Sequence, residues 1–424
     1  MSTMLIKPSH LSGIVTIPPS KSLSHRAIIC ASLANGVSKI SNIIFSDDIV
    51  ATIESMRAFG AKIDVFDDYI LVDGSNVFAS PPETVIDCRE SGSTLRFLIP
   101  LALHTDLTTF IASKRLGERP LDSIYNIFDS HNIEYTKQSA PFSLTVEKGS
   151  ISEHVVLDGN ISSQFLSGLL FSLPLFSKDF RITLSSPLES KGYVDLTLDM
   201  LKKFGIAVEN REYSEFIVQG GQRYIPHDYC CEGDFSQAAF FLSASALGHD
   251  ITCCNLNPES LQGDKKILDI LKLMGADIIW ANNIVRVSAP QLNAIEIDAS
   301  QIPDLVPILA TVATFAHGNT VIYNASRLRL KESDRLASIS DVLNKLGSRI
   351  TEFQDKLIIQ GSNGKSLHGD VNISSYNDHR IAMSIAIASS LSIGTVALEN
   401  PRCVRKSYPH FWDDYTMLGG ITLG

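Results

Sequence analysis

The sequence lacks the residue patterns of a metal site or a disulfide framework. Its seven cysteines include no C-x-x-C pair, and the adjacent pairs at 230–231 and 253–254 suit neither an ordinary disulfide nor a zinc site. The eleven histidines include no H-E-x-x-H motif. Metal chemistry therefore has no support, and we expect buried, reduced thiols in a cytoplasmic protein.

Long apolar runs and an excess of positive charge are also missing. No apolar run reaches the roughly 18 residues that a membrane-spanning helix needs, and residues 1–8 lack the apolar core of a signal peptide. The net charge of −10 disfavours sequence-independent binding of nucleic acid. No Walker loop indicates nucleotide hydrolysis. We expect neither a membrane nor a nucleic-acid partner, so any anion site must be local.

The chain has the composition of a globular protein, with 44% hydrophobic and 19% charged residues among 424. One pattern recurs along it: an apolar helix end, a Gly or Asn stop, and a short alternating strand. The stops are 70 to 73 residues apart, which indicates an internal repeat. They are Gly60, Asn132, Gly205, Gly275, Gly347 and Gly419.

Each repeat reads as helix, strand, helix, stop and hairpin, which predicts an α/β fold. The first helices are expected to begin at or beside residues that cap helices. These positions are Ser22, Ser93, Ser162, Asp234, Asp304 and Asp378.

The repeats are expected to form two domains of three repeats each. Residues 220–226 read as a linker, and the sixth repeat ends before its hairpin is complete. The opening strands near residues 5–6 and 13–17 would supply the missing part. We therefore predict an inserted domain at 19–225 and a discontinuous domain of residues 1–18 plus 226–424, joined by a double hinge.

Polar clusters fall at the helix starts of the first half. Lys21 and Arg26 stand where a turn becomes a helix, and the unpaired N–H groups there would favour a phosphate or carboxylate. Further clusters lie at 89–96, 117–120, 162–164 and 190–193. Each alone would read as an ordinary cap or loop, but their repetition at equivalent positions favours a binding site.

The second half is more heavily charged. Asp304 precedes a very apolar helix, as an N-cap or as a general base facing a cleft. Alternation over residues 327–331 predicts a strand with three cations on one face, followed by Glu332 and Arg335 on the first turn of a helix. A solvated charge run is the ordinary alternative.

Together the clusters predict a cleft between the domains that suits two small anionic molecules. Its cations would be Lys21, Arg26, Arg119, Lys331, Arg335, Arg380 and Lys406.

The same residues resemble a known family over essentially the whole chain. The motifs Pro-Ser-Lys-Ser, Ser-Gly-Ser-Thr-x-Arg, Gly-Glu-Arg-Pro, Ser-Ser-Gln, Ile-Pro-Asp, Lys-Glu-Ser-Asp-Arg and Asn-Asp-His-Arg, with the late Lys406, occur here in one order. They are similar to those of the 5-enolpyruvylshikimate-3-phosphate synthase family of enolpyruvyl transferases. The resemblance implies two similar domains of three βαβαββ repeats, each an inside-out α/β barrel, that close on substrate.

The implied reaction moves the enolpyruvyl group of phosphoenolpyruvate to the 5-hydroxyl of shikimate 3-phosphate through a tetrahedral intermediate, in aromatic amino-acid biosynthesis. By matching position, Asp304 would take the hydroxyl proton, Glu332 would deliver and remove the methylene proton, and Lys21 would touch both substrates. Shikimate 3-phosphate would contact Lys21, Ser22, Arg26, Ser162, Ser163, Gln164, Ser190, Tyr193, Asp304 and Lys331. Phosphoenolpyruvate would contact Lys21, Gly92, Arg119, Gln164, Arg335, Arg380 and Lys406. The resemblance implies no cofactor and no partner beyond these two small molecules, and we expect a monomer.

Two positions depart from the family pattern: Glu90 stands where Asn is frequent, and Arg327 where some relatives use Asn.

Three alternative functions stay open. A UDP-N-acetylglucosamine 1-carboxyvinyltransferase would carry a cysteine in the loop at 113–120, which has none. A non-catalytic anion-binding protein would not need both Asp304 and Glu332, and a structural repeat protein would bind neither substrate.

Overall fold

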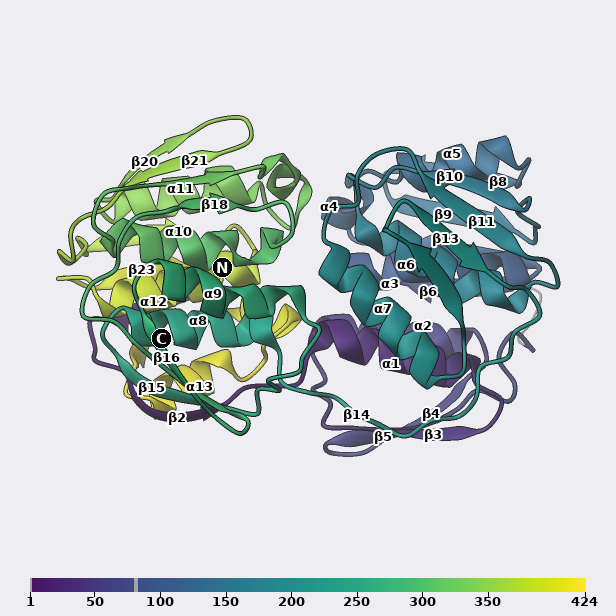
Figure 1. Ribbon diagram of the computed structural model, residues 1–424, viewed down its shortest axis with the longest axis horizontal. Coiled ribbons are helices and arrows are strands. Elements are labelled where there is room, and N and C mark those ends of the chain that lie inside the picture. Colours follow the sequence, from purple (N-terminus) through teal and green to yellow (C-terminus); the bar gives the residue numbers. More distant parts are fainter. Residues whose placement is uncertain (1, 80–82) are drawn as a thin grey trace. The chain divides into compact units, whose positions relative to one another are not determined.

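A computed structural model of the chain describes residues 2–79 and 83–424 (Figure 1). The chain divides into two compact units, which we describe separately. The inserted unit comprises residues 19–231, and the discontinuous unit comprises residues 1–18 and 232–424. The expected boundary after residue 225 differs from this division, because β14 (Tyr229–Cys230) pairs with a strand of the inserted unit.

One sheet topology occurs six times among the described residues, each time with four strands. The first two strands of a repeat run parallel, and the hairpin adds two antiparallel strands, the last of them beside the second. The predicted α/β architecture of βαβαββ repeats is therefore confirmed. A parallel pair needs a crossover, and a helix supplies it in four of the six repeats. In the first and fourth repeats, one strand of the parallel pair comes from a distant part of the sequence.

Three repeats form the inserted unit (Figure 1). The first contains β14, α1 (Lys21–Leu33), β3 (Val37–Ser41), α2 (Asp47–Ala58), β4 (Lys62–Val65) and β5 (Tyr69–Asp73). The second contains β6 (Glu83–Asp87), α3 (Gly92–Leu98), β7 (Leu107–Ile111), α5 (Asp122–Ser130), β8 (Tyr135–Ser139) and β9 (Phe142–Glu147), with the short α4 (Lys114–Gly117) before α5. The third contains β10 (His154–Leu157), α6 (Ser163–Ser172), β11 (Phe180–Leu184), α7 (Lys191–Lys203), β12 (Val208–Arg211) and β13 (Glu215–Val218).

The discontinuous unit repeats the pattern. Its first repeat contains β2 (Ser12–Thr16), α8 (Phe235–Ala246), β15 (Asp250–Cys254), α9 (Lys266–Leu273), β16 (Asp277–Ala281) and β17 (Ile284–Ser288). Its second contains β18 (Glu296–Asp298), α10 (Val306–Phe315), β19 (Asn319–Tyr323), α11 (Arg335–Lys345), β20 (Arg349–Glu352) and β21 (Leu357–Gln360). Its third contains β22 (Val371–Ser374), α12 (His379–Ser390), β23 (Val396–Glu399), α13 (Phe411–Met417), β24 (Ile421–Leu423) and β1 (Thr3–Lys7).

Three strands join their sheets from distant parts of the sequence. β1 pairs with β23 and β24 and completes the sixth repeat, as expected for the segment near residues 5–6. The expectation for residues 13–17 was wrong, because β2 pairs with β15 in the fourth repeat. β14 pairs with β3 in the first repeat.

The helix stops behave as their residue types predict. All five glycine stops have positive φ, from 82° at Gly205 to 109° at Gly275. Asn132 has φ 55°, so it takes the same left-handed conformation without being glycine. The same local conformation therefore recurs at each of the six stops, which are 70 to 73 residues apart.

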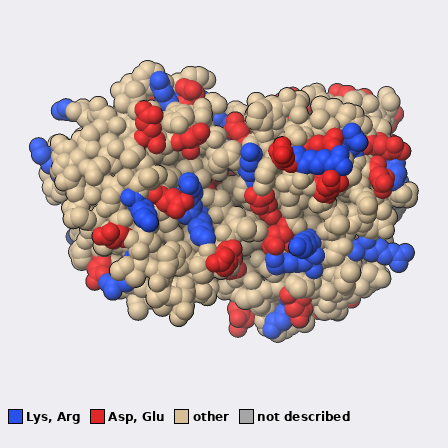
Figure 2. Space-filling model, viewed as in Figure 1, with Lys and Arg blue, Asp and Glu red and all other residues tan. Residues whose placement is uncertain are grey.

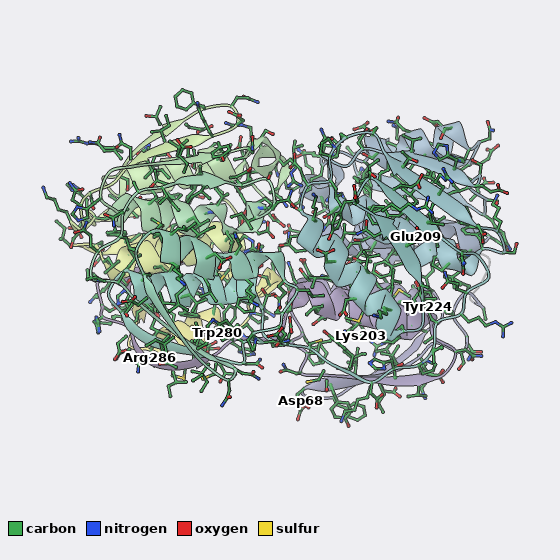
Figure 3. All side chains as sticks on the ribbon, viewed as in Figure 1. Asp68, Lys203, Glu209, Tyr224, Trp280 and Arg286 are labelled. Atoms are coloured by element: carbon green, nitrogen blue, oxygen red, sulfur yellow. The ribbon has the colours of Figure 1, made fainter. Side chains whose placement is uncertain are left out.

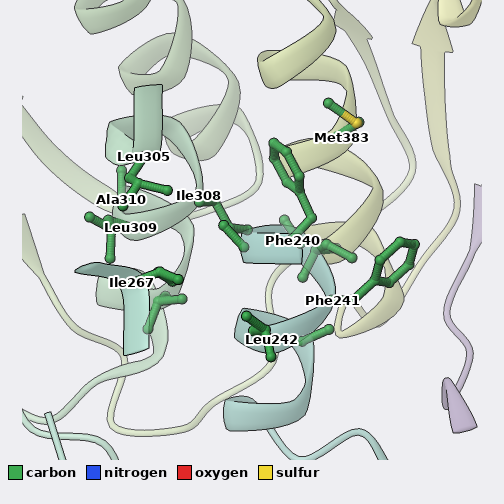
Figure 4. Close-up of a cluster of buried hydrophobic side chains, with 14 of the residues drawn as sticks. Phe240, Phe241, Leu242, Ile267, Leu305, Ile308, Leu309, Ala310 and Met383 are labelled. Atoms are coloured by element: carbon green, nitrogen blue, oxygen red, sulfur yellow. The ribbon is translucent and has the colours of Figure 1, made fainter. Parts of the chain in front are cut away.

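Each unit has its own apolar core, to which the first helices of its repeats contribute. In the discontinuous unit, α8, α10 and α12 pack against one another through side chains such as Phe240, Ile308 and Met383 (Figure 4). In the inserted unit, Tyr224, which is labelled in Figure 3, is buried. Its hydroxyl donates to the carbonyl of Phe171 at 2.8 Å. The largely apolar sequences of these helices follow from their burial.

The visible surface carries acidic and basic side chains in small mixed groups (Figure 2). Exposed pairs such as Arg211 with Glu209 at 2.7 Å contribute little to stability. Within the described residues, no helix combines the length and the apolar character required to cross a membrane.

Candidate active site

The predicted site residues lie at helix starts, where capping leaves polar groups in defined positions. Ser20, Ser91, Ser162, Asp234 and Asp378 each accept a backbone N–H in the first turn of α1, α3, α6, α8 and α12. Asp304 does not cap its helix. It lies in a 3₁₀ turn at Pro303–Leu305, directly before α10, so its carboxylate is available for other partners.

Asp304 lies at the centre of a charged network in the discontinuous unit. Arg335 Nη1 is 2.8 Å from Asp304 Oδ1, and Arg380 Nη2 is 2.9 Å from Asp304 Oδ2. Arg380 Nη1 also donates to the Asp304 carbonyl at 3.1 Å, and Lys331 Nζ is 3.5 Å from Asp304 Oδ1. The predicted Asp304, Lys331, Arg335 and Arg380 therefore meet.

Arg335 also binds the second predicted acid. Its Nη2 is 2.6 Å from Glu332 Oε2, and its Nε is 2.8 Å from Asp378 Oδ2. Lys406 Nζ is 3.7 Å from Glu332 Oε1 and completes the group. The Arg335 side chain is 1% exposed, so three carboxylates hold a guanidinium that burial alone would disfavour.

The network fixes the charges of its members. Burial raises the pKa of Asp304, but Arg380, Lys331 and Arg335 outweigh it and hold the pKa of this carboxyl well below its ordinary value. Burial lowers the pKa of Arg335, but Asp378, Glu332 and Asp304 raise it above its ordinary value. Burial lowers the pKa of Lys331 below its ordinary value, although the nearby Asp304 acts to raise it. Without a bound anion, Asp304 is therefore a weak base.

Asp264 is a second buried carboxyl in the same unit. It lies in a 3₁₀ turn at Gly263–Lys265 before α9, is 2% exposed and accepts a hydrogen bond from the hydroxyl of Ser236. Burial raises the pKa of Asp264 to about 6, Asp304 adds to the rise, and Arg380 opposes it.

We expect Asp264→Asn to become more stable relative to the parent protein as the pH rises from about 4 to about 6. In the unfolded chain an aspartate ionises near pH 3.9, whereas folded Asp264 resists ionisation until about pH 6. Rising pH therefore favours the unfolded parent over this window, and asparagine removes that penalty. The measurement is the difference in thermal midpoint at each pH. The control is Asp269→Asn, an exposed partner of Lys266. A difference that does not change with pH would contradict the assignment.

In the inserted unit, Lys21 and Arg26 lie on the first two turns of α1. Lys21 Nζ is 2.8 Å from Asp48 Oδ2, and both side chains are largely buried. Arg26 donates through Nε to Thr197 Oγ1 and through Nη2 to the Tyr193 carbonyl, each at 2.8 Å. Burial lowers the pKa of Arg26 to about 10, so it stays charged at neutral pH. Arg26 thereby ties α1 to the start of α7.

A second group of cations surrounds the start of α3. A Cβ atom built on Gly92 would lie 3.1 Å from Arg119 Nη1 and 3.2 Å from Arg96 Nη1. Arg96 Nη1 donates to Gln164 Oε1 at 3.0 Å, and Gln164 Nε2 donates to Ser93 Oγ at 3.0 Å. Two guanidinium groups therefore meet over a glycine, where a small anion can approach the backbone closely.

The remaining predicted residues of this unit also lie at helix starts. Ser162 and Ser163 begin α6, with Ser162 as its cap. Ser190 precedes α7 with φ 58° and makes no side-chain cap bond, and Tyr193 lies on the first turn of that helix. Ser22 follows Lys21 in α1 and its carbonyl accepts a bond from Arg26 Nη1 at 2.7 Å.

The predicted strand over residues 327–331 was wrong. Residues Ser326–Leu330 form a 3₁₀ helix, and the three cations point to different partners. Arg327 donates to the Ser300 carbonyl at 2.7 Å, Arg329 pairs with Asp334 and Glu352 at 2.8 Å, and Lys331 approaches Asp304. Glu332 also precedes α11 rather than lying on its first turn, although it contacts Arg335 as expected.

Sequence reasoning missed four residues of these groups. Arg96 and Asp378 stand inside motifs that were recognised, so a signal was present. Asp48 and Asp264 lie in segments without such a motif, and only the fold brings them to their partners.

Among the described residues, no three His, Cys, Asp or Glu side chains come together in a way that could hold a metal ion.

Comparison with known proteins places this geometry in a family. The family described as EPSP synthase (3-phosphoshikimate 1-carboxyvinyltransferase) matches residues 5–415. The chain is 49% identical over the full length of both chains to the 3-phosphoshikimate 1-carboxyvinyltransferase of Clostridium perfringens strain ATCC 13124. It is 48% identical to that of Clostridioides difficile strain 630, over 99% of this chain and 98% of the relative.

Solved structures agree in fold. An EPSP synthase from Acinetobacter baumannii superposes with a TM-score of 0.84 at 23% identity, over 100% of this chain and 99% of the other. The enolpyruvyl transferase NikO from Streptomyces tendae gives 0.81 at 17% identity, over 99% and 98%. With the match over residues 5–415 and full-length relatives near half identity, the chain belongs to the EPSP synthase (3-phosphoshikimate 1-carboxyvinyltransferase) family.

Proposed function

We propose that this chain transfers the enolpyruvyl group of phosphoenolpyruvate to the 5-hydroxyl of shikimate 3-phosphate, releasing phosphate, in the shikimate pathway of aromatic amino-acid biosynthesis. Family membership supports the reaction. The observation that supports the chemistry is that Arg335 pairs with both acids. Its Nη1 lies 2.8 Å from Asp304 Oδ1 and its Nη2 lies 2.6 Å from Glu332 Oε2. Two carboxylates on one anion-binding guanidinium can each move a proton beside a bound substrate.

The proposal assigns the groups described above to the two substrates. Lys21 belongs to both groups and would contact both substrates. Shikimate 3-phosphate would be held by Lys21, Ser22, Arg26, Ser162, Ser163, Gln164, Ser190, Tyr193, Asp304 and Lys331. Phosphoenolpyruvate would be held by Lys21, Gly92, Arg119, Gln164, Arg335, Arg380 and Lys406.

Anion binding would also change Asp304. Arg335 and Arg380 already donate to its carboxylate, so a substrate carboxylate or phosphate must compete with Asp304 for the same N–H groups. As those donors turn to the substrate, the pKa of Asp304 rises towards its ordinary value. The base would therefore gain strength when the substrates are bound.

In the proposed addition, Glu332 enters as the protonated carboxylic acid. The 5-hydroxyl oxygen bonds to C2 of phosphoenolpyruvate, Asp304 takes the hydroxyl proton, and Glu332 gives its own proton to the methylene carbon and becomes a carboxylate. In the elimination, the bond from C2 to the phosphate oxygen breaks, and Glu332 removes a methyl proton as the double bond re-forms. The proton on Asp304 leaves with the phosphate. The surrounding cations stabilise the charge that develops on the leaving group.

The test is an assay of phosphate release from phosphoenolpyruvate with two acceptors. We expect release with shikimate 3-phosphate and none with UDP-N-acetylglucosamine. Release only with the sugar nucleotide would establish the related transferase, which the cysteine-free loop at 113–120 disfavours. Release with neither acceptor would contradict the proposal and favour a binding role.

We expect Gly92→Ala to raise KM for phosphoenolpyruvate about tenfold, equivalent to about 1.4 kcal/mol, with a smaller effect on KM for shikimate 3-phosphate. The added methyl would lie 3.1 Å from Arg119 Nη1 and 3.2 Å from Arg96 Nη1, so both guanidinium groups must move by a few tenths of an ångström. Steady-state kinetics with each substrate varied in turn measures both constants. An unchanged KM for phosphoenolpyruvate would remove the start of α3 from its binding site.

A further inference from the structure

A chain of buried polar side chains links three helices of the inserted unit. His25 of α1 contacts Thr52 of α2 at 2.7 Å between Nδ1 and Oγ1. Thr52 Oγ1 is 2.7 Å from Thr94 Oγ1 of α3, and Thr94 Oγ1 is 2.7 Å from Ser91 Oγ, which caps that helix. All four residues are at most 1% exposed. We call these four residues the hydroxyl chain.

The direction of donation along the hydroxyl chain follows from counting protons. Thr94 donates its hydroxyl proton to Ser91, so it can only accept from Thr52. Thr52 thereby uses its own proton, so it can only accept from His25 Nδ1. Burial, against the opposite effect of Asp48 and with the help of Lys21 and Arg26, lowers the pKa of His25 to about 3. His25 is therefore a neutral imidazole with its proton on Nδ1, and Nε2 has no hydrogen-bond partner among the described residues.

We propose that the hydroxyl chain is a positioning device that fixes the start of α3, and with it Gly92, relative to the start of α1. The inference rests on the proposed function, in which Lys21 and Gly92 contact the same phosphoenolpyruvate. α1 packs on α2 and α2 packs on α3, and the hydroxyl chain follows the same route. Apolar contacts are non-directional, whereas hydrogen bonds with defined donors hold both distance and angle.

The position of Gly92 has little tolerance. The space over its Cα is bounded by Arg119 Nη1 and Arg96 Nη1, at 3.1 and 3.2 Å from the Cβ position. A shift of α3 by a few tenths of an ångström therefore changes how closely an anion can approach between the two guanidinium groups. The hydroxyl chain ends on Ser91, the residue directly before Gly92, so its effect reaches the backbone at this point.

Replacing Thr52 by valine tests the proposal, because valine has nearly the same shape but breaks the hydroxyl chain at its centre. We expect KM for phosphoenolpyruvate to rise about tenfold, while kcat and KM for shikimate 3-phosphate change less than about threefold. Thr52→Ser keeps a hydroxyl and should restore KM. The control is Thr108→Val, which breaks a buried Thr108–Thr105 pair of 2.6 Å in the same unit. Equal kinetics for Thr52→Val and Thr108→Val would overturn the positioning role.

Nitrogen NMR of histidine-labelled protein tests the same proposal without substrate. We expect His25 to show a protonated Nδ1 and an unprotonated Nε2 that do not titrate between pH 5 and 8. A proton on Nε2 would reverse the donation assigned above. A nitrogen shift that shows no hydrogen bond at Nδ1 would break the hydroxyl chain at its first link and overturn the proposal, even if the valine variant fails to fold. Should the wild-type protein release no phosphate, the proposed function fails, whereas this spectrum still reports on the hydroxyl chain itself.

Discussion

Asp304→Asn should lower kcat about a thousandfold, within the range for loss of a general base, without raising KM for phosphoenolpyruvate. Asparagine keeps the shape of the side chain but cannot take the proton of the 5-hydroxyl. It also removes the negative charge that now occupies Arg335 and Arg380, at 2.8 and 2.9 Å. Both arginines become more available to an anion, so substrate binding should be retained or strengthened while turnover falls.

This split between kcat and KM separates a base from a structural residue. The control is Asp341→Asn, which removes a half-exposed carboxylate that pairs with Lys345 in the same unit at 2.8 Å. We expect that variant to have parental kinetics. If Asp304→Asn kept turnover within a few fold of the parent, Asp304 would not be the base. If it lost binding and turnover together, its role would be to hold Arg335 and Arg380 in place.

Lys21→Met should lower kcat/KM about a thousandfold, at the upper end of the loss expected for one preorganised donor. The Lys21 side chain is 15% exposed and its ammonium lies 2.8 Å from Asp48 Oδ2, so it is held in place before substrate arrives. In the proposed reaction it neutralises charge on both substrates and on the departing phosphate. Methionine keeps most of the apolar stem and removes the charge.

Two further variants sharpen that prediction. Lys21→Arg keeps the positive charge but changes the geometry of its donors. We expect its kcat/KM to lie between those of Lys21→Met and the parent protein. Lys137→Met removes an exposed ammonium that lies 4.1 Å from the Tyr125 ring in the same unit, and it should leave the kinetics unchanged. Near-parental kinetics for Lys21→Met would exclude Lys21 from the reaction.

The repeat could be predicted from sequence because its markers are local. A helix stop needs a residue that tolerates positive φ, and a single residue such as Gly60 or Asn132 indicates such a position in the sequence. The capping residues at the helix starts are equally local, which is why the helices begin within about two residues of their expected positions.

The exchange of strands between distant segments had no such marker. β14 is only two residues long, so it shows no alternation, and its partner β3 lies about 190 residues earlier in the chain. β2 alternates clearly, but alternation does not say which sheet a strand joins. Pairing over such separations depends on the tertiary fold.

The candidate site shows the same division. Asp304, Glu332 and Arg335 carry recognisable motifs, and the structure brings them together. The charges at residues 327–331 alternate as in a strand, yet Ser326–Leu330 form a 3₁₀ helix, from which Arg329 pairs with Asp334 and Glu352. Which acid pairs with which cation is a property of packing, and periodicity does not encode it.

The fate of the bridging oxygen of phosphoenolpyruvate tests the central claim most directly. With ¹⁸O between C2 and phosphorus, incubation with shikimate 3-phosphate should yield phosphate that carries the label, because enolpyruvyl transfer breaks the bond between carbon and oxygen. The acceptor should gain the three-carbon group in the same experiment, as read by mass spectrometry. Label retained in pyruvate, with unlabelled phosphate and an unchanged acceptor, would show cleavage at phosphorus and contradict the account.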